Sequence, residues 1–424
     1  PVVMMGLAYM QPMTLFDTFG IVSGLTDGHV PTAYAFALIA ILFTALSYGK
    51  LVRRYPSAGS AYTYAQKSIS PTVGFMVGWS SLLDYLFAPM INILLAKIYF
   101  EALVPSIPSW MFVVALVAFM TAFNLRSLKS VANFNTVIVV LQIVLIAVIL
   151  GMVVYGVFEG EGAGTLASTR PFWSGDAHVI PMITGATILC FSFTGFDGIS
   201  TLAEEVSEPE KNVGRAILIA LVVIGTVFFL QTYIVCLIEP DYNKFNASTA
   251  LFDACAVAIG DWFRIVLLVV NILAVGIANT LNAQAACSRV LFSMGRDRLL
   301  PGALAKVHPK FRTPYVAILL IGVVSLACTI IFTDEQLTKL VNFGAISSFM
   351  MLNLAVIWFF FVKEQRRSGM DLVNYLVYPL AGTLILLYVW SGFDHLTQIL
   401  GFSWLAVGIV FGYIKSKGYK EVPD

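Results

Sequence analysis

The stretch FSFTGFDGIS, residues 191–200, interrupts a long apolar segment near its middle, and the stretch GLAYMQPMT, residues 6–14, interrupts another. They lie in the sixth and the first apolar segments of the chain, so the two interruptions occupy corresponding places. Paired apolar segments that are broken by Gly or Pro indicate the substrate site of a secondary transporter. The break at 191–200 also carries Asp197, and an ionisable residue at the depth of the hydrocarbon core is a functional candidate.

The composition is that of a membrane protein. Hydrophobic residues make up 59% of the chain and charged residues 12%, whereas soluble domains carry about 25% charged residues. The net charge of +1 gives no reason to expect a nucleic acid partner. The five cysteines lack metal-ligand spacing, and no P-loop, GxSxG or HExxH motif is present. We therefore expect no enzyme activity, no cofactor and no metal site.

Twelve segments of the sequence are long and apolar enough to be membrane helices. A spanning helix needs about 20 mostly apolar residues, and the chain lacks the ten-residue alternation that is typical of a membrane β-barrel. The sequence predicts an all-α integral membrane protein with one domain over residues 1–424. The predicted helices cover approximately 2–25, 31–48, 72–100, 109–124, 131–156, 179–203, 215–238, 262–294, 315–332, 338–362, 374–391 and 397–415.

The distribution of lysine and arginine predicts the orientation of these helices. If the first segment runs outward from the cytoplasm, most of the 25 basic residues fall on the cytoplasmic side. This is the imbalance that the positive-inside rule describes. We expect both termini to lie in the cytoplasm.

Three carboxylates fall inside apolar segments. Asp84 lies near the middle of the third segment, with no basic residue within seven positions, so its partner is either another helix or the substrate. Asp17 lies nearer the outer end of the first segment, where it is a candidate vestibule or gate group. Asp197 lies at the second break.

The two breaks differ in a way that favours a cationic substrate. Phe191, Phe193 and Phe196 can form an aromatic wall that contacts methylene and ammonium groups. The first break is bulky at Met10-Gln-Pro-Met13, without the Gly-Ser-Gly run that would form an anion-binding nest of N–H groups. These patterns favour a cation without a carboxylate.

The chain resembles the amino acid–polyamine–organocation transporters, and within them the bacterial putrescine importers, over essentially its whole length. PSAGSAYTY (56–64) and the GRDxxxP element within MGRDRLLP (294–301) are family-wide, while MQPMT (10–14), GWSSLLDYL (78–86) and FSFTGFD (191–197) indicate putrescine import. The resemblance implies a leucine-transporter-like 5+5 inverted repeat with broken helices 1 and 6. Repeat one would cover about 1–156, repeat two about 179–362, and helices 11 and 12 about 374–415. Residues 49–70 would form a cytoplasmic re-entrant or amphipathic connection.

The resemblance also implies residue roles. Asp197 matches the acidic gate and substrate position of helix six, and Phe191 matches the aromatic residue that closes over the substrate. Asp84 and Tyr85 match positions that meet the far end of a bound amine. The candidate substrate-binding residues are Asp84, Tyr85, Asp197, Phe191, Phe193, Met10, Gln11 and Ala8. The candidate gate or proton-coupling residues are Asp17, Glu204, Asn282 and Gln142, the last standing where some relatives have a lysine used in proton coupling.

The function expected from these patterns is proton-coupled import of putrescine, a small aliphatic diamine, by alternating access across a bacterial inner membrane. The partners would be putrescine, a co-transported proton and membrane lipid. One alternative is a permease for amino acids or another monoamine. The alternative from a different class is a nutrient receptor that has the transporter fold but does not transport.

Overall fold

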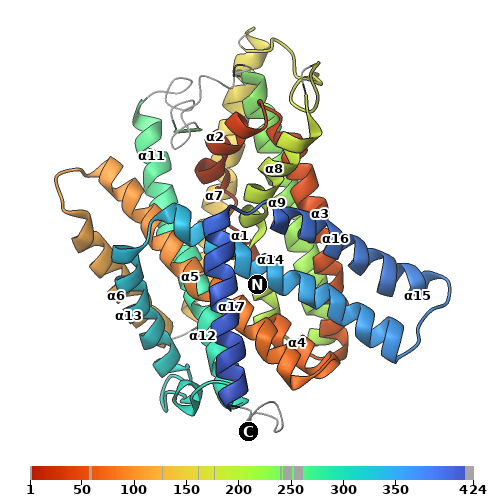
Figure 1. Cartoon of the computed structure of the whole chain (residues 1–424). Coiled ribbons are helices and arrows are strands. Elements are labelled where there is room, and N and C mark those ends of the chain that lie inside the picture. Colours follow the sequence, from red (N-terminus) through yellow and green to blue (C-terminus); the bar gives the residue numbers. More distant parts are fainter. Residues whose placement is uncertain are drawn as a thin grey trace.

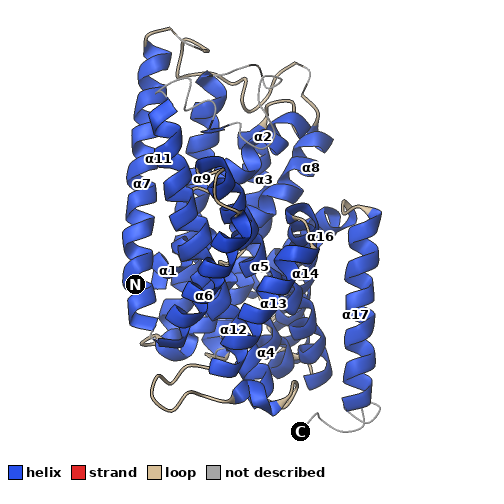
Figure 2. Cartoon of the chain, turned by 90° about the vertical axis from the view of Figure 1, so that its left-hand side faces the viewer, coloured by secondary structure: helices blue, strands red, loops and turns tan. Residues whose placement is uncertain are grey.

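The computed structural model describes residues 2–56, 60–126, 128–160, 162–175, 177–238, 241, 251–252 and 261–415, and it is helical with no strand among them (Figures 1 and 2). The helices of the first half are α1 (Val2–Met10), α2 (Leu15–Leu25), α3 (Val30–Arg54), α4 (Ser60–Ser68), α5 (Pro71–Leu103), α6 (Ser109–Arg126) and α7 (Leu128–Phe158). The second half contains α8 (Val179–Leu189), the 3₁₀ helices η1 (Cys190–Phe193) and η2 (Asp197–Glu205), α9 (Pro209–Ile238), α11 (Asp261–Asn271), the π-helix η4 (Ile272–Asn279), α12 (Thr280–Arg296), α13 (Tyr315–Ile331), α14 (Asp334–Val356), α15 (Met370–Leu372), α16 (Tyr378–Ser391) and α17 (His395–Lys415). The remaining short elements are η5 (Gly302–Ala305), η6 (Ile357–Lys363) and η7 (Val373–Val377).

Ten helices in the described part of the chain are long and apolar enough to cross a membrane. This confirms the predicted class of all-α membrane protein, and large apolar side chains on the outer helices α6 and α7 are exposed, as lipid contact requires. The predicted segments 2–25 and 315–332 are not among the ten, because the first divides into α1 and α2 and the second forms the 17-residue α13. The count of twelve stays a prediction.

The first break lies where the sequence predicts it. Helix α1 ends at Met10, Gln11 adopts a positive φ of 52°, and α2 begins at Leu15. Pro12 has no N–H and so cannot continue the helix. The Thr14 hydroxyl donates to the Met10 and Gln11 carbonyls, at 3.0 and 2.8 Å, and so satisfies carbonyl groups that the helix end would leave without partners.

The second break is confirmed as well. Helix α8 gives way to η1, Thr194 is extended, and Gly195 has a φ of 98°, which is a conformation that side chains with a Cβ rarely adopt. The chain then turns into η2, which starts at Asp197. The carboxylate of Asp197 therefore lies at the N-terminal, positive end of a helical segment.

Helix α5 lies at the centre of the bundle, where it packs against α4, α12 and α14. The predicted connection over 49–70 is largely helical: α3 continues to Arg54 and α4 packs on α5, while residues 57–59 lie outside the described residues. Figure 2 shows α7 and α17 at opposite edges of the bundle.

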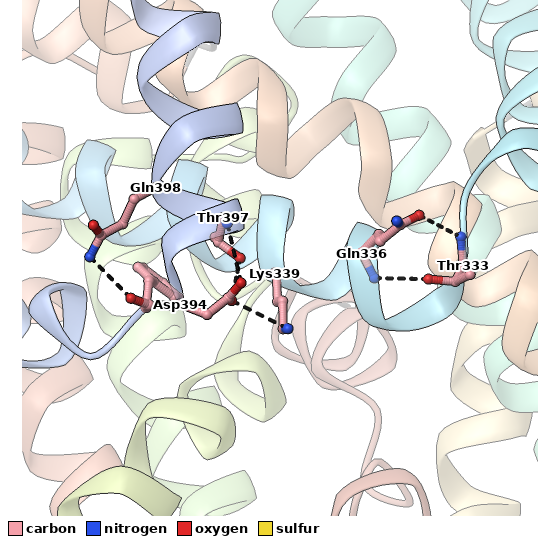
Figure 3. A network of polar contacts seen from close by, with 7 residues as sticks. Thr333, Gln336, Lys339, Asp394, Thr397 and Gln398 are labelled. Atoms are coloured by element: carbon pink, nitrogen blue, oxygen red, sulfur yellow. Dashed lines mark hydrogen bonds and ion pairs between the residues drawn. The ribbon is translucent and has the colours of Figure 1, made fainter.

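Two polar contacts fasten the C-terminal helices to the rest of the molecule. The indole N–H of Trp79 donates to the Trp404 carbonyl at 2.8 Å, and that of Trp404 donates to the Trp79 carbonyl at 2.7 Å. Lys339 on α14 lies 3.3 Å from Asp394, which also accepts a hydrogen bond from Thr397 (Figure 3). The Thr397 hydrogen bond lowers the pKa of Asp394, so this contact persists over the physiological pH range.

Candidate functional site

Two residues predicted for the site are in direct contact at the second break. The Tyr85 hydroxyl on α5 donates to Asp197 Oδ2 on η2 at 2.5 Å, and each side chain is 1% exposed. Backbone groups of Gly195 and Gly198 contact the same carboxylate. Tyr85 and the η2 terminus thus hold one carboxylate in a fixed position inside the bundle.

The second predicted carboxylate lies nearby on the central helix. Asp84 is 4% exposed and is close enough to Asp197 for the two charges to interact. Helix α14 approaches α5 closely at this point, since a Cβ on Gly344 would lie 2.9 Å from the Asp84 nitrogen. Two acidic groups from different helices therefore converge in a region without water-exposed surface, and such a pair attracts a group that carries more than one positive charge.

A small cavity of about 20 Å³, which we call the α2-side cavity, lies between the two breaks. It is lined from the first break by Tyr9, Met10, Gln11 and Thr14, and from α2 by Asp17. The other helices contribute Ala88, Asn92, Leu95, Phe191, Thr194 and Asn279. Four of these residues, Met10, Gln11, Asp17 and Phe191, are predicted site residues, so the structure brings both breaks to one cavity.

Two further cavities follow on the other side of the breaks. The α12-side cavity, also about 20 Å³, is lined by Gly6, Tyr9, Gly198, Thr201, Asn282 and Arg289, among others. A larger cavity of about 210 Å³, which we call the vestibule, shares Thr201 and Arg289 with it and extends to Glu204 and to the exposed Val307. The three cavities form a series from the breaks to the surface.

A polar network borders the vestibule. Arg296 at the end of α12 lies 3.6 Å from Glu204 of η2 and 3.3 Å from Asp297. The Tyr62 hydroxyl of α4 donates to Asp297 at 2.8 Å, and burial raises the pKa of Tyr62, so it remains protonated as a donor. The predicted gate residue Glu204 thus belongs to a contact that joins three elements.

The backbone of the first break has no N–H group left for a substrate. Gln11 N–H donates to the Leu7 carbonyl at 2.8 Å, and Thr14 N–H donates to the Gln11 carbonyl at 3.1 Å. Met13 N–H donates to Gln142 Oε1 at 3.3 Å, and Pro12 carries no N–H. The Gln142 amide, predicted as a coupling candidate, therefore occupies a donor that an anionic substrate would otherwise bind.

The two carboxylates Asp84 and Asp197 and their neighbour Tyr85 line none of these three cavities, and two further predicted residues also lie elsewhere. Phe193 is not among the residues that line the described cavities, because its ring packs against Tyr34 and Phe228 with centroid distances of 6.1 and 5.6 Å. Ala8 is likewise buried in the core. Asn282 lines the α12-side cavity and accepts a hydrogen bond from Asn135 at 2.6 Å.

Seven of the eleven residues that line the α2-side cavity are not among the predicted site residues, and three of the seven are Tyr9, Asn92 and Asn279. Asn92 and Asn279 are joined by a hydrogen bond of 3.3 Å. Both are polar amides inside apolar segments, a feature by which the sequence could have marked them as candidate site residues. Asn279 also ends a π-helix, a feature that is frequent at functional sites. No feature of the sequence distinguishes Tyr9 as a site residue other than its position in the first break.

Two broken helices beside buried carboxylates are typical of membrane transporters, and comparison with known proteins shows that the chain is a permease rather than an enzyme. Residues 10–422 match the family described as amino acid permease, so the chain belongs to that family. It is 63% identical to the "Low-affinity putrescine importer PlaP" of Escherichia coli (strain K12), over 99% of this chain and 93% of that protein. It is 27% identical to the "Methylthioribose transporter" (91% and 85% covered) and 25% identical to the "Branched-chain amino acid permease BcaP" (92% and 86% covered), both of Bacillus subtilis (strain 168).

Proposed function

We propose that the chain is a secondary active importer of putrescine in a bacterial inner membrane. The observation that carries the proposal is the Asp197 carboxylate, fixed at the second break by Tyr85 and accompanied by Asp84. A diamine carries two positive charges and no carboxylate, which matches two buried acids beside a break that offers no free N–H groups. The 63% identical relative is named as an importer of the same diamine.

In this proposal each carboxylate holds one ammonium group. The nitrogen atoms of extended putrescine lie about 6 Å apart, as bond lengths near 1.5 Å require. Phe191, Met10 and Gln11 would cover the methylene groups, while Phe193 and Ala8 would support them from the core. The Tyr85 hydroxyl would orient the Asp197 carboxylate toward the incoming ammonium group.

The proposed topology treats α1 and α2 as one broken helix and α13 as a short spanning helix, which gives twelve membrane helices with both termini in the cytoplasm. Repeat one would cover about 1–156 and repeat two about 179–362, related as a 5+5 inverted repeat, with the last two helices over about 374–415. In this orientation the vestibule is cytoplasmic, Asp17 lies on the outer side, and the contact between Glu204 and Arg296 belongs to an inner gate.

Selectivity against amino acids tests the substrate. Ornithine is putrescine with an added carboxylate, and the first break has no N–H groups to receive it, so we expect ornithine to compete poorly for uptake of labelled putrescine into proteoliposomes. Neutral amino acids are expected to compete poorly for the same reason. Equal competition by ornithine and putrescine would favour the amino acid permease, and specific binding without uptake would favour a receptor.

We further propose that protons drive uptake, with Asp17, Glu204, Asp197 or Asp84 as candidate carriers. A protonophore is expected to collapse putrescine accumulation, because the buried carboxylates offer sites for proton exchange. Replacing external Na⁺ with choline is expected to leave accumulation unchanged. A strict requirement for Na⁺ would overturn this proposal and direct attention to the amides Asn279 and Asn282 as ligands.

A further inference from the structure

Tyr9 is the residue at which the series of cavities is divided. Among the described residues it is the one that lines both the α2-side cavity and the α12-side cavity. It belongs to the last turn of α1, within the first break, and it is 9% exposed. Tyr9 therefore borders a cavity at the first break and the cavity that leads to the vestibule, and it is near enough to Asp84 and Asp197 for electrostatic interaction.

The Tyr9 ring rests on the two glycines of the second break. A Cβ on Gly195 would lie 2.8 Å from the ring carbons Cγ and Cδ2, and a Cβ on Gly198 would lie 2.5 Å from Cε1. Any larger residue at Gly198 would occupy the space that the ring now fills. The glycines thus allow an aromatic ring of the first broken helix to seat directly on the backbone of the second.

The volumes of the two small cavities beside Tyr9 limit what each can hold. Each small cavity has about 20 Å³, which is room for about one water molecule. A four-carbon diamine fits neither of them. Movement of the Tyr9 ring away from Gly195 and Gly198 would join the two cavities, and Thr201 and Arg289 would then connect them to the vestibule.

We propose that the Tyr9 ring is the shutter between the substrate site and the cytoplasmic exit path. With the ring seated on Gly195 and Gly198, the carboxylate pair is closed toward the vestibule, and with the ring displaced, the diamine can leave. The π-face of the ring offers a cation–π contact to each ammonium group as it passes. This inference rests on the proposed function for the identity of the cargo, but the shutter itself can be tested without any substrate.

Cys287 is a native thiol whose rate of chemical labelling can report whether the Tyr9 ring is seated. It lies on α12 in the same buried cluster as Tyr9 and Tyr85, is fully buried, and is near enough to Tyr9 for electrostatic interaction. In inside-out vesicles, a small methanethiosulfonate that carries an ammonium group should modify Cys287 slowly in the unaltered protein. In Tyr9→Ala the modification should be faster by about tenfold or more, because modification of a buried group follows the population of the open form. Mass spectrometry assigns the label, and Cys287→Ser should remove it.

Two more variants separate the shutter from a general loss of structure. Tyr9→Phe keeps the ring, so Cys287 should stay protected at the unaltered rate. Gly198→Ala changes η2 instead of α1. Its added Cβ should displace the Tyr9 ring, so labelling of Cys287 should also become faster. Each variant is first required to purify as a single folded species. A folded Tyr9→Ala protein that is labelled at the unaltered rate would overturn the proposal, as would a Tyr9→Phe protein labelled as fast as Tyr9→Ala. Neither outcome depends on putrescine being the substrate.

Discussion

Replacing Asp197 with Asn is expected to abolish putrescine uptake and to weaken equilibrium binding by roughly thirtyfold or more. Asn keeps the size of the side chain and its hydrogen bond to Tyr85 but removes the negative charge that faces the ammonium group. Loss of one partner from a buried charge pair costs about 2–5 kcal/mol, and about 1.4 kcal/mol is tenfold in affinity. Binding of labelled putrescine to the detergent-purified variant measures the effect.

Two further variants are expected to have smaller effects than Asp197→Asn. Asp197→Glu is expected to keep partial uptake, because the charge remains and only its reach changes. Tyr85→Phe removes one hydroxyl hydrogen bond, which is worth about 0.5–1.5 kcal/mol, so binding is expected to weaken by at most roughly tenfold. Unaltered binding in folded Asp197→Asn would show that the substrate does not meet this carboxylate.

Asp84→Asn is expected to produce a loss of similar size, of roughly thirtyfold or more. Asp84 is buried beside Asp197, and in the proposed complex it holds the second ammonium group of the diamine. A monoamine such as butylamine has no second ammonium group, so its weaker binding is expected to be nearly insensitive to the substitution. Competition of putrescine and butylamine for the same variant measures this difference directly.

The matched control for Asp84→Asn is Ser81→Ala. Ser81 lies on the same helix and is also buried, but its hydroxyl donates to the Val77 carbonyl within α5, at 2.9 Å. Its removal is expected to leave binding of putrescine unchanged. If folded Asp84→Asn binds putrescine normally, Asp84 acts as a structural bridge or a proton carrier, and the clamp of two carboxylates is wrong.

The sequence was sufficient to locate both helix breaks and to select Asp197 and Tyr85 as candidates, but it did not predict that these two side chains contact each other. Gly195 and Pro12 have backbone requirements that are readable from residue type alone, because one permits a positive φ and the other removes a donor. Asp197 and Tyr85 are polar residues in apolar surroundings, which makes them conspicuous in any membrane segment.

The directions of side chains at the breaks could not be predicted. A regular helix repeats every 3.6 residues, so faces can be assigned from spacing, but that period is lost where the backbone unwinds. Phe191 and Phe193 are two residues apart, yet Phe191 lines the α2-side cavity and Phe193 packs into the core. Tyr9 was not selected for the same reason, since its importance arises from contact with Gly195 and Gly198, more than 180 residues away.

The separation of two one-water cavities by the Tyr9 ring also bears on the energy supply of the cell. Protons move rapidly along continuous files of hydrogen-bonded water, and each elementary charge that crosses a membrane dissipates about 2.3 kcal/mol per 100 mV. Tyr9 lines both cavities, so in the proposed shutter its seated ring interrupts a water file between them. If the proposed shutter holds, the closed permease does not conduct protons, and a cell could keep many idle copies without dissipating its proton gradient, whichever ion drives uptake.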